Sequence, residues 1–416
     1  MEKQNIEPGK VFGNIGVLDI RKATEESVAN IKSIGNVGML LYTPETTVLI
    51  QRLNMENLGS SIEVPADARL LTGQVVFGQD YFKNQTTPLS LCVTGQIIVH
   101  PQIPAEDIET GLKELIIVGQ MICPEHLSGA IQSKLRNIIG HTQTYTYTQS
   151  SRLTIGKLIL DENYLRSLAD GAELVVIGDL KLPQVLPNNV FEQKVQRIQV
   201  TGKIVCREEN AQVLFARLDD RTGQPQVTVI PTGFNVVEKP LLLDADLLKA
   251  LPSQKLYCTE RIQIERDVTP QVLDSCLEAL IAKELVICPT TLKEVIARKC
   301  NMLETDVLFY EGELWLVDDE LALPASRFDY LEGKATLVVL GELMLAPDVE
   351  PQVLIERLAK VHNFGEISCT PQQMGAIQSL LGVKYGELVD STKRKADEDV
   401  DEEKLGGMGN AGYLAL

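Results

Sequence analysis

Apolar residues alternate with other residue types around a glycine that recurs along the chain. The segments GNIGVLDI, which starts at Gly13, and GNVGMLLY, which starts at Gly35, lie 22 residues apart and nearly superimpose. Each glycine is followed by apolar residues two and four positions later, a period-2 pattern that is typical of a β-strand. The pattern returns, in steps of 22 or 24 residues within each run, at Gly73, Gly95, Gly119, Gly156, Gly178, Gly202, Gly341 and Gly365.

Four more copies of the strand pattern lack the glycine and bring the total to fourteen; they are centred on Lys239, Glu260, Glu284 and Asp319. The positions two and four residues after the centre are apolar in every copy, so we expect both to face the core. The second of these positions is a cysteine at Cys123, Cys206, Cys288 and Cys369. Because free cysteine behaves as a small buried hydrophobe, we expect core thiols at these sites rather than metal ligands.

A longer period is superimposed on the short one. Gly13, Gly95, Gly178, Glu260 and Gly341 are spaced by 82, 83, 82 and 81 residues. A sequence segment also repeats: DVTPQVL, which starts at Asp267, returns as DVEPQVL at Asp348. Such self-similarity indicates tandem modules. We expect module copies near residues 10–65, 66–148, 149–230, 231–311 and 312–389, the first of them truncated at its N-terminal side.

Helical stripes follow several strands, as after Pro124 and Pro289, where proline suits the first helical turn. A strand, a helix and a second strand about 22 residues later predict parallel pairing. The recurring glycine then either allows a covering backbone to approach closely or marks a bulge. Between modules, paired apolar runs around turns predict β-hairpins within 144–155, 213–230 and 307–316.

These patterns predict an α/β fold: an elongated solenoid of tandem modules of about 82 residues, built from 22–24-residue strand–helix units, with inserted β-hairpins. Units of this kind cannot bury their own faces and are expected to stack into one continuous core. Fourteen strands at a spacing of about 4.8 Å would form a sheet on the order of 65 Å long.

The run Leu112-x-x-Leu115-x-Ile117-x-Gly119-x-Met121-x-Cys123-Pro124 resembles the strand segment of leucine-rich repeat proteins, and the step of 22 to 24 residues is similar. The resemblance covers the short repeat along most of residues 10–385 and implies a binding scaffold with a concave strand face. The sequence departs from that family because no asparagine ladder follows the strand, a glycine lies near that place, and the longer module is foreign to it.

The pattern stops after Val389. Residues 390–416 predict a charged, disordered tail, because the stretch from Ser391 to Lys404 has little to bury. The tail ends in glycines and a small apolar segment that contains Tyr413, Leu414 and Leu416. This end can be interpreted as a docking peptide, a proteolysis tag or a loose tail.

Charge and composition exclude several kinds of partner. The chain of 416 residues carries 39 basic and 57 acidic residues, a net charge of −18, which argues against nucleic acids and acidic membranes. No apolar run approaches a membrane span and the start of the chain lacks a secretory pattern, so we expect a cytoplasmic protein. The eight cysteines, none of them in CxxC, indicate reduced thiols.

Candidate chemistry is sparse. The sequence contains no GxSxG, HExxH or GxxxxGK[ST] motif, so we predict no catalytic residues, no cofactor and no metal site. The four histidines fall at unrelated positions of the repeat. Asp219-Asp220 and Asp318-Asp319-Glu320 could supply paired carboxylates or a weak cation site, but both lie beside turns, where acids are usually solvated.

Two features favour an interaction role. Polar residues directly after the repeat centre would form a row, rich in amides at one end (Asn14, Asn36, Gln74, Gln96, Gln120) and acidic at the other (Glu320, Glu342, Glu366). The outer side of the strands is also apolar, at Val76, Ile98, Ile122, Ile159, Leu242 and Met344, and must be covered by the chain's helices or hairpins, a second copy or a partner.

We therefore predict a non-enzymatic scaffold that binds a protein partner or itself. The alternative is an enzyme or small-ligand binder whose site is formed by inter-module hairpin loops. The candidate interaction residues are Tyr145, Tyr147, Tyr310 and Trp315 in these loops and Tyr413, Leu414 and Leu416 in the tail.

Overall fold

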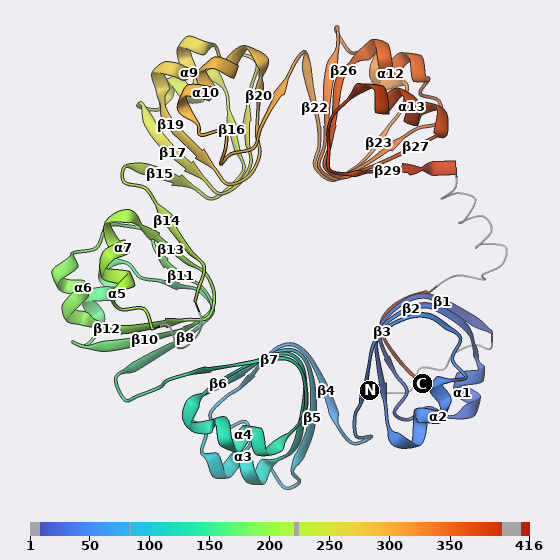
Figure 1. Ribbon diagram of the computed structural model, residues 1–416, viewed down its shortest axis with the longest axis vertical. Coiled ribbons are helices and arrows are strands. Elements are labelled where there is room, and N and C mark those ends of the chain that lie inside the picture. Colours follow the sequence, from blue (N-terminus) through green and yellow to red (C-terminus); the bar gives the residue numbers. More distant parts are fainter. Residues whose placement is uncertain (1–8, 84, 220–223, 393–408) are drawn as a thin grey trace. The chain divides into compact units, whose positions relative to one another are not determined.

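The protein has an α/β fold in which many parallel strands form several small sheets (Figure 1). The computed structural model describes residues 9–83, 85–219, 224–392 and 409–416. Among these residues every pairing between strands is parallel. The chain divides into two compact units, residues 1–230 with 402–416 and residues 231–401.

We name five sets of strands and helices by their residues: block 1 (10–64 with 409–416), block 2 (69–145) and block 3 (151–230) in the first unit, and block 4 (234–310) and block 5 (313–390) in the second. Block 1 has one sheet, in the order β3-β2-β1-β30. Its elements are β1 (Lys10–Asp19), α1 (Glu25–Ala29), β2 (Ile31–Tyr42), η1 (Pro44–Thr46), α2 (Thr47–Ile50), β3 (Met55–Glu63) and β30 (Gly409–Ala415).

Block 2 also has a single sheet, in the order β4-β5-β6-β7, whose long strands run without a break through the repeat glycines. Its elements are β4 (Arg69–Phe77), β5 (Leu89–Val99), α3 (Ala105–Gly111), β6 (Leu112–Pro124), η2 (Glu125–Leu127), α4 (Ser128–Lys134) and β7 (Leu135–Tyr145). Pro124 ends β6 and caps η2, so the turn after this proline begins as a 3-10 helix before α4 follows.

In block 3 each long strand is divided at the repeat centre, which gives two sheets, β12-β10-β8 and β14-β13-β11-β9. Its elements are β8 (Ser151–Ile155), β9 (Leu158–Ile159), α5 (Glu162–Ser167), β10 (Ala172–Ile177), β11 (Leu180–Leu182), α6 (Asn188–Lys194), β12 (Val195–Val200), β13 (Ile204–Arg207), α7 (Glu208–Phe215) and β14 (Val227–Ile230).

Block 4 repeats this arrangement with the sheets β15-β17-β19 and β16-β18-β20-β21. Its elements are β15 (Phe234–Val237), β16 (Leu241–Leu243), α8 (Ala245–Ala250), β17 (Gln254–Cys258), β18 (Ile262–Ile264), α9 (Pro270–Cys276), β19 (Leu277–Ala282), β20 (Val286–Pro289), η4 (Thr290–Leu292), α10 (Lys293–Lys299) and β21 (Val307–Tyr310).

Block 5 has the sheets β22-β24-β26-β28 and β23-β25-β27-β29. Its elements are β22 (Glu313–Val317), β23 (Glu320–Leu323), α11 (Ser326–Asp329), β24 (Ala335–Val339), β25 (Glu342–Leu345), α12 (Pro351–Arg357), β26 (Leu358–Asn363), β27 (Glu366–Cys369), α13 (Pro371–Leu380), β28 (Leu381–Lys384) and β29 (Glu387–Asp390).

Each block has a core of its own between its strands and its helices. The positions four residues after the repeat centre are buried as expected, including all four cysteines, except Val17 and Met39. The positions two residues after it are also buried, except Val75, Leu241 and Leu321, which lie on the edge strands β4, β16 and β23. An edge strand has a neighbour on one side only, so its side chains are less covered.

The prediction of one continuous core and sheet is wrong, because the described chain forms separate sheets and separate cores. The outer faces of consecutive blocks pack against each other instead. Ile98 and Ile122 of block 2 lie with Val175 and Ile177 of block 3 in one such layer, and equivalent layers join blocks 1 and 2 and blocks 4 and 5. The chain itself therefore covers much of the apolar outer side, whereas Val76, Ile159, Leu242 and Met344 remain exposed.

The predicted inter-module hairpins are also wrong. The strands expected to pair across the turns belong to different sheets: β7 pairs with β6 and β8 with β10, while β21 pairs with β20 and β22 with β24. Residues 213–215, expected in a strand, belong to α7. A short link carries the chain from one block to the next, so the runs on its two sides join different sheets, although Tyr145 and Leu153, like Tyr310 and Leu314, pack in one apolar layer between the blocks.

The repeat glycines lie where successive strands approach most closely. Gly73, Gly95, Gly119 and Gly140 are neighbours across the sheet of block 2, and each has a positive φ. A Cβ on Gly119 would lie 2.0 Å from the carbonyl oxygen of Gly95. The strands pair through these glycines without a register shift, so no bulge lies there. The close backbone is the carbonyl of the adjacent strand in the same sheet rather than a covering layer, and the positive φ favours glycine.

None of the helices in the described part of the chain is long and apolar enough to cross a membrane.

Candidate functional site: the strand-docking site on β1

The strand β30 docks on the edge of β1 and completes the sheet of block 1. Its residues pair in parallel with those of β1, as Ile15 with Ala411 and Leu18 with Leu414. Residues 409–416 were expected in a disordered tail; they instead form a strand, which corrects that prediction for this segment, whereas residues 393–408 lie outside the described part. Block 1 thus gains at this edge the strand that its own N-terminal side lacks.

Side-chain amides fix the register of the docked strand. Asn14 donates from its backbone nitrogen, at 3.0 Å, and from its Nδ2, at 3.2 Å, to the Oδ1 of Asn410. The same ladder continues through Asn36 and Asn57, with Nδ2–Oδ1 distances of 2.8 Å at both steps. A shift of the strand by one residue would break the ladder and turn the apolar side chains to the other face.

The docking surface requires a glycine at position 16. A Cβ added to Gly16 would lie 2.6 Å from the carbonyl oxygen of Gly412, too close for any real side chain. A Cβ on Gly412 would meet nothing within 4 Å, because β30 is the edge strand. Leu414 and Leu416 contribute apolar contacts and are only 1% and 3% exposed in the core of block 1.

A buried ion pair lies at the end of the docked strand. Asp19 and Arg21 form a bidentate pair, with Nη2–Oδ2 and Nε–Oδ1 distances of 2.7 and 2.9 Å, and their side chains are 7% and 9% exposed. Tyr413 of β30 donates its hydroxyl to Oδ2 of Asp19 at 2.7 Å, and the backbone nitrogen of Leu416 donates to the carbonyl oxygen of Asp19 at 3.0 Å. Asp19 therefore holds the docked strand through two groups, its side-chain carboxylate at Tyr413 and its main-chain carbonyl oxygen at Leu416.

The protonation states match this geometry. Burial alone would raise the pKa of Asp19, but hydrogen bonds from Arg21 and Tyr413 and the charge of Arg21 outweigh it and hold that pKa below its usual range. Burial and the neighbouring Asp19 raise the pKa of Tyr413 to about 12, so its hydroxyl stays a donor at neutral pH.

Arg21 also connects the docking site to block 2. Its Nη1 donates to the carbonyl oxygens of Pro65 and Ala68, at 3.1 and 2.7 Å. A cavity of about 330 Å³ opens beside it, between Asp19, Arg21, Asp67 and the end of β30. The docked strand thus forms one wall of a polar cavity at the junction of blocks 1 and 2.

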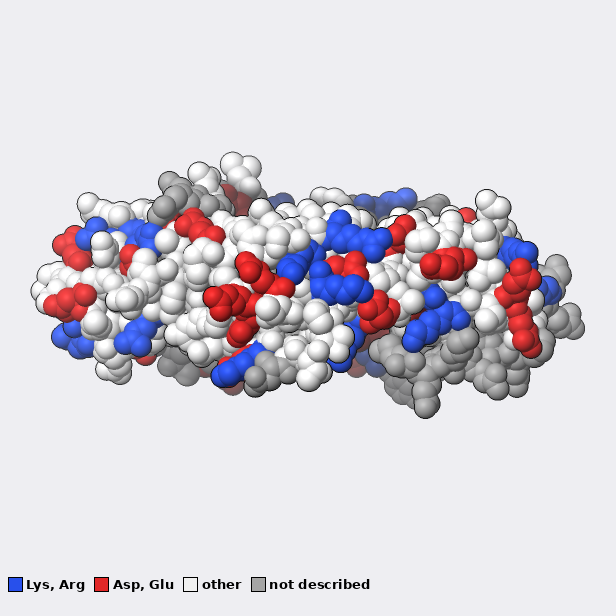
Figure 2. Space-filling view, turned by 90° about the horizontal axis from the view of Figure 1, so that it is seen from below, with Lys and Arg blue, Asp and Glu red and all other residues white. Residues whose placement is uncertain are grey.

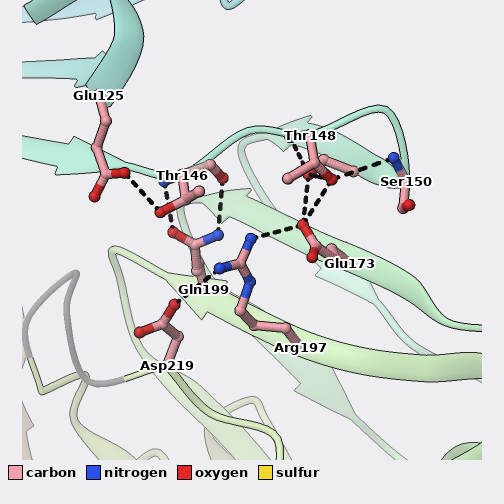
Figure 3. A network of polar contacts seen from close by, with 9 residues as sticks. Glu125, Thr146, Thr148, Ser150, Glu173, Arg197, Gln199 and Asp219 are labelled. Atoms are coloured by element: carbon pink, nitrogen blue, oxygen red, sulfur yellow. Dashed lines mark hydrogen bonds and ion pairs between the residues drawn. The ribbon is translucent and has the colours of Figure 1, made fainter.

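A second polar network lies at the junction of blocks 2 and 3 (Figure 3). Arg197 on β12 donates from Nη2 to Glu173 on β10 at 2.6 Å, and its Nη1 lies 3.5 Å from Asp219. Glu173 also accepts hydrogen bonds from Thr148 and Ser151 at 2.9 and 3.0 Å. Burial would raise the pKa of Glu173, but these donors hold it below its usual range.

Gln199 fixes the link between these two blocks. Its side-chain amide accepts from the backbone nitrogen of Thr146 and donates to the carbonyl oxygen of the same residue, both at 2.9 Å (Figure 3). Thr336 does the same for Glu311 at the junction of blocks 4 and 5, at 3.0 and 2.8 Å. In both places one buried polar side chain satisfies a backbone that has left its sheet.

The aromatic residues predicted for interaction are used inside the molecule. Tyr145 and Tyr310 are 1% and 2% exposed and donate their hydroxyls to the carbonyl oxygens of Val99 and Ile264, at 2.8 and 2.9 Å. Trp315 packs on Phe328 with ring centroids 5.2 Å apart and donates its Nε1 to Glu313 at 2.9 Å. These three side chains are therefore buried within the blocks.

Tyr147 lies half-buried in the apolar layer between blocks 2 and 3, so none of the four loop aromatics forms a surface site. The three tail residues, in contrast, come together at the β1 docking site. The sequence missed Asp19, Arg21 and Asn410 as partners of that site. The signal that could have found it is the pattern Asn-x-Gly at Asn410, which repeats those at Asn14 and Asn36.

The thiols are unsuited to nucleophilic chemistry. Burial raises the pKa of Cys92, Cys123, Cys206, Cys258 and Cys369 to about 11 and that of Cys288 to about 12, so these groups are protonated at neutral pH. Among the described residues no group of three or more His, Cys, Asp and Glu side chains is placed to hold a metal ion. Asp318 of the acidic cluster pairs with Arg261, and Asp220 lies outside the described residues.

Charged side chains of both signs are interspersed on the face shown in Figure 2. Ion pairs in the described part of the chain include Lys113 with Asp67 at 3.3 Å and Arg136 with Glu114 at 3.1 Å. The described residues on this face form no long basic stripe of the kind that follows a phosphate backbone.

Comparisons with protein-family models, with curated proteins and with solved structures find no match for this chain.

Proposed function

We propose that the protein is a non-enzymatic tandem-repeat scaffold, a solenoid of modules of about 82 residues, that self-associates by exchange of the strand 409–416 between copies. The observation that carries the proposal is the docking of β30 on β1, two segments that are nearly 400 residues apart in the chain: Asp19 and Tyr413 are separated by 394 positions. The contact has the specificity of a recognition site, with a ladder, a required glycine and a buried carboxylate.

Addition of a strand to an exposed sheet edge is a common mode of peptide recognition. The main-chain groups of β1, the side chains of Asn14 and Asp19 and the space left by Gly16, which has no side chain, recognise the docked segment in the same way, whether it comes from the same copy or another. Docking within one chain is favoured by the high effective concentration of a tethered segment. Exchange becomes favourable when copies are concentrated or when the internal docking is impaired.

Two complementary variants of the full chain test this proposal. Gly16→Val blocks the docking surface while leaving residues 409–416 intact. The double change Leu414→Asp and Leu416→Asp disables the strand and leaves β1 intact. In each variant alone, residues 409–416 cannot dock on β1 of the same chain. In an equimolar mixture, the intact strand of the first variant can dock on the intact β1 of the second.

We expect each variant alone to be a monomer by light scattering and the mixture to form a one-to-one dimer. Gly412→Ala is the matched control, because its methyl group enters open space and should leave internal docking unchanged. A mixture that stays monomeric, with both variants folded by circular dichroism, refutes self-association by strand exchange. A dimer that forms equally from either variant alone refutes it as well.

A further inference from the structure

Blocks 3 and 5 place equivalent residues at their junctions with the preceding blocks. In block 3, Glu173 pairs across the sheet with Arg197, and Val175 with Gln199. In block 5 the same two steps of the register pair Thr336 with Lys360 and Val338 with His362. Counted from the repeat glycines Gly202 and Gly365, Arg197 corresponds to Lys360 and Gln199 to His362.

The cation of this network has carboxylate partners in block 3 but not in block 5. Arg197 has two carboxylate partners, Glu173 and Asp219. Lys360 takes the place of the arginine, but threonine replaces the glutamate, and among the described residues Lys360 has no carboxylate within ion-pair distance. The junction of blocks 4 and 5 therefore has a cation at the position of Arg197 but no carboxylate at the position of Glu173.

One ring nitrogen of the histidine at this junction, Nε2 of His362, has no hydrogen-bond partner among the described residues. His362 is 6% exposed, and its Nδ1 accepts a hydrogen bond from the backbone nitrogen of Val383 at 3.2 Å. With Nδ1 as the acceptor, the proton of the neutral ring lies on Nε2, and this buried donor has no acceptor in the structure. Burial and the charge of Lys360 lower the pKa of His362 to about 4, so the neutral form is the relevant one.

These groups line one cavity of about 390 Å³. Lys293, the second lysine of the cavity, lies over the ring of Phe309 at 5.6 Å and also has no carboxylate partner among the described residues. The walls between the polar groups are apolar, formed by Val307, Leu308, Phe309, Ala359 and Val383. Glu311 is the one acidic residue of the lining, and its side chain forms no ion pair with either lysine.

We infer that this cavity between blocks 4 and 5 is a binding site for a small phosphate-bearing molecule. A phosphate dianion supplies the negative charge that Glu173 and Asp219 supply to Arg197 in block 3, and its oxygens accept hydrogen bonds from lysine ammonium groups and a neutral N–H donor. The apolar walls, which include the half-buried Phe309, suit an organic group attached to the phosphate. Inorganic phosphate shares the anionic chemistry but would leave those walls uncovered.

NMR spectra of the histidine ring nitrogens in the full chain test this assignment directly. The protein has four histidines, so the imidazole nitrogen signals of a ¹⁵N-labelled sample are few, and His362→Gln assigns the signal of interest. We expect phenyl phosphate to shift the His362 signals in a saturable manner, and inorganic phosphate to shift them with weaker affinity. Equal affinity for the two probes would assign the site to free phosphate.

Lysine variants separate the site from general salt effects. Lys293→Met and Lys360→Met should each weaken phenyl phosphate binding by about tenfold or more, because each removes one charge-assisted contact. Both side chains are exposed, so the variants should fold. Lys249→Met, in α8 and outside the cavity, is the matched control and should bind like the parent protein. His362 signals that do not respond to either probe, or titrations unchanged in both lysine variants, overturn the inference.

Discussion

Tyr413 donates a hydrogen bond to Asp19 across 394 positions of sequence, with the two oxygens 2.7 Å apart. The acceptor is a buried carboxylate that also binds Arg21, so the tyrosine joins the docked strand to a charged group rather than to a neutral one. Hydrogen bonds to charged groups contribute more than neutral ones. The docked strand is thus held by this polar contact as well as by the buried side chains of Leu414 and Leu416.

Tyr413→Phe removes this hydrogen bond and keeps the ring. We expect a loss of about 1.5–3 kcal/mol in the stability of the docked strand. The amide of Leu416, which is bonded to the carbonyl oxygen of Asp19, should then exchange its hydrogen faster by roughly tenfold or more. The control is Tyr330→Phe, at a side chain that is 87% exposed. Unchanged exchange at Leu416 would show that the hydroxyl contributes nothing to docking.

Gly95→Ala tests the close approach of strands in block 2. A methyl group there would lie 2.2 Å from the carbonyl oxygen of Gly73, and the φ of +135° is rarely adopted by other residues. We expect a loss of more than about 3 kcal/mol, measured as a fall in the thermal midpoint by circular dichroism. Gly129→Ala in α4 meets nothing within 4 Å and should be neutral or stabilising by up to about 1 kcal/mol. Equal effects of the two changes would contradict the role of the repeat glycine.

Gln199→Ala tests the two hydrogen bonds between Gln199 and the backbone of Thr146 at the junction of blocks 2 and 3. The change leaves the backbone nitrogen and carbonyl of Thr146 without their partner in a buried place, so we expect a loss of about 2–3 kcal/mol by urea unfolding. Gln193→Ala removes an exposed side-chain contact with Asp170 and should cost less than about 0.5 kcal/mol. If the two variants unfold at the same urea concentration, the hydrogen bonds between Gln199 and Thr146 do not contribute to stability.

Burial of neutral His362 makes the second unit sensitive to acid. Its pKa of about 4 in the folded protein lies below the ordinary value of 6.5, so the unfolded chain binds a proton more readily between these values. The free energy of unfolding should therefore fall as the pH drops from about 6.5 to about 4, by up to about 3 kcal/mol from this residue. The groups around the ring are Lys360, Lys293 and Glu311.

The difference between the parent protein and His362→Gln isolates this contribution. Stability measured at several pH values should be more pH-dependent in the parent than in the variant across that interval. Parallel curves would mean that His362 is not held neutral by its surroundings.

The repeat pattern predicted much of the local structure. Alternation around Gly95 and Gly178 gave the strands, the parallel pairing and the buried cysteines, because these depend on residues within one repeat. Neighbouring members of the polar row also lie side by side within one sheet, as Asn14 with Asn36 and Gln74 with Gln96, but the single row that was predicted is divided among separate sheets. Its amides form hydrogen-bonded ladders, as with Gln74 Nε2 and Gln96 Oε1 at 2.6 Å.

The division into separate sheets was not predictable from the same pattern. Thr144–Thr148 and Arg152–Ile155 have the composition of paired strands, and Tyr145 and Leu153 even share one apolar layer. Only the strands that they pair with, β6 for β7 and β10 for β8, assign them to different blocks. The docking of residues 409–416 escaped for a related reason. Asn410, Gly412 and Leu414 carry the repeat pattern, but the charged stretch before them suggested a tail, and pairing with β1 depends on a partner almost 400 residues away.

The position of β30 in the sequence has a consequence for synthesis on the ribosome. The edge of β1 emerges early, but the strand that covers it is translated 394 residues later in the case of Tyr413 and Asp19. At about 5–20 residues per second, that edge stays unpaired for roughly 20–80 s in every nascent chain. During this interval neighbouring nascent chains on one messenger present the same open edge, and strands with unpaired edges readily join other strands. The timing of translation therefore determines whether the edge of β1 is first paired by residues 409–416 of its own chain or by those of another copy.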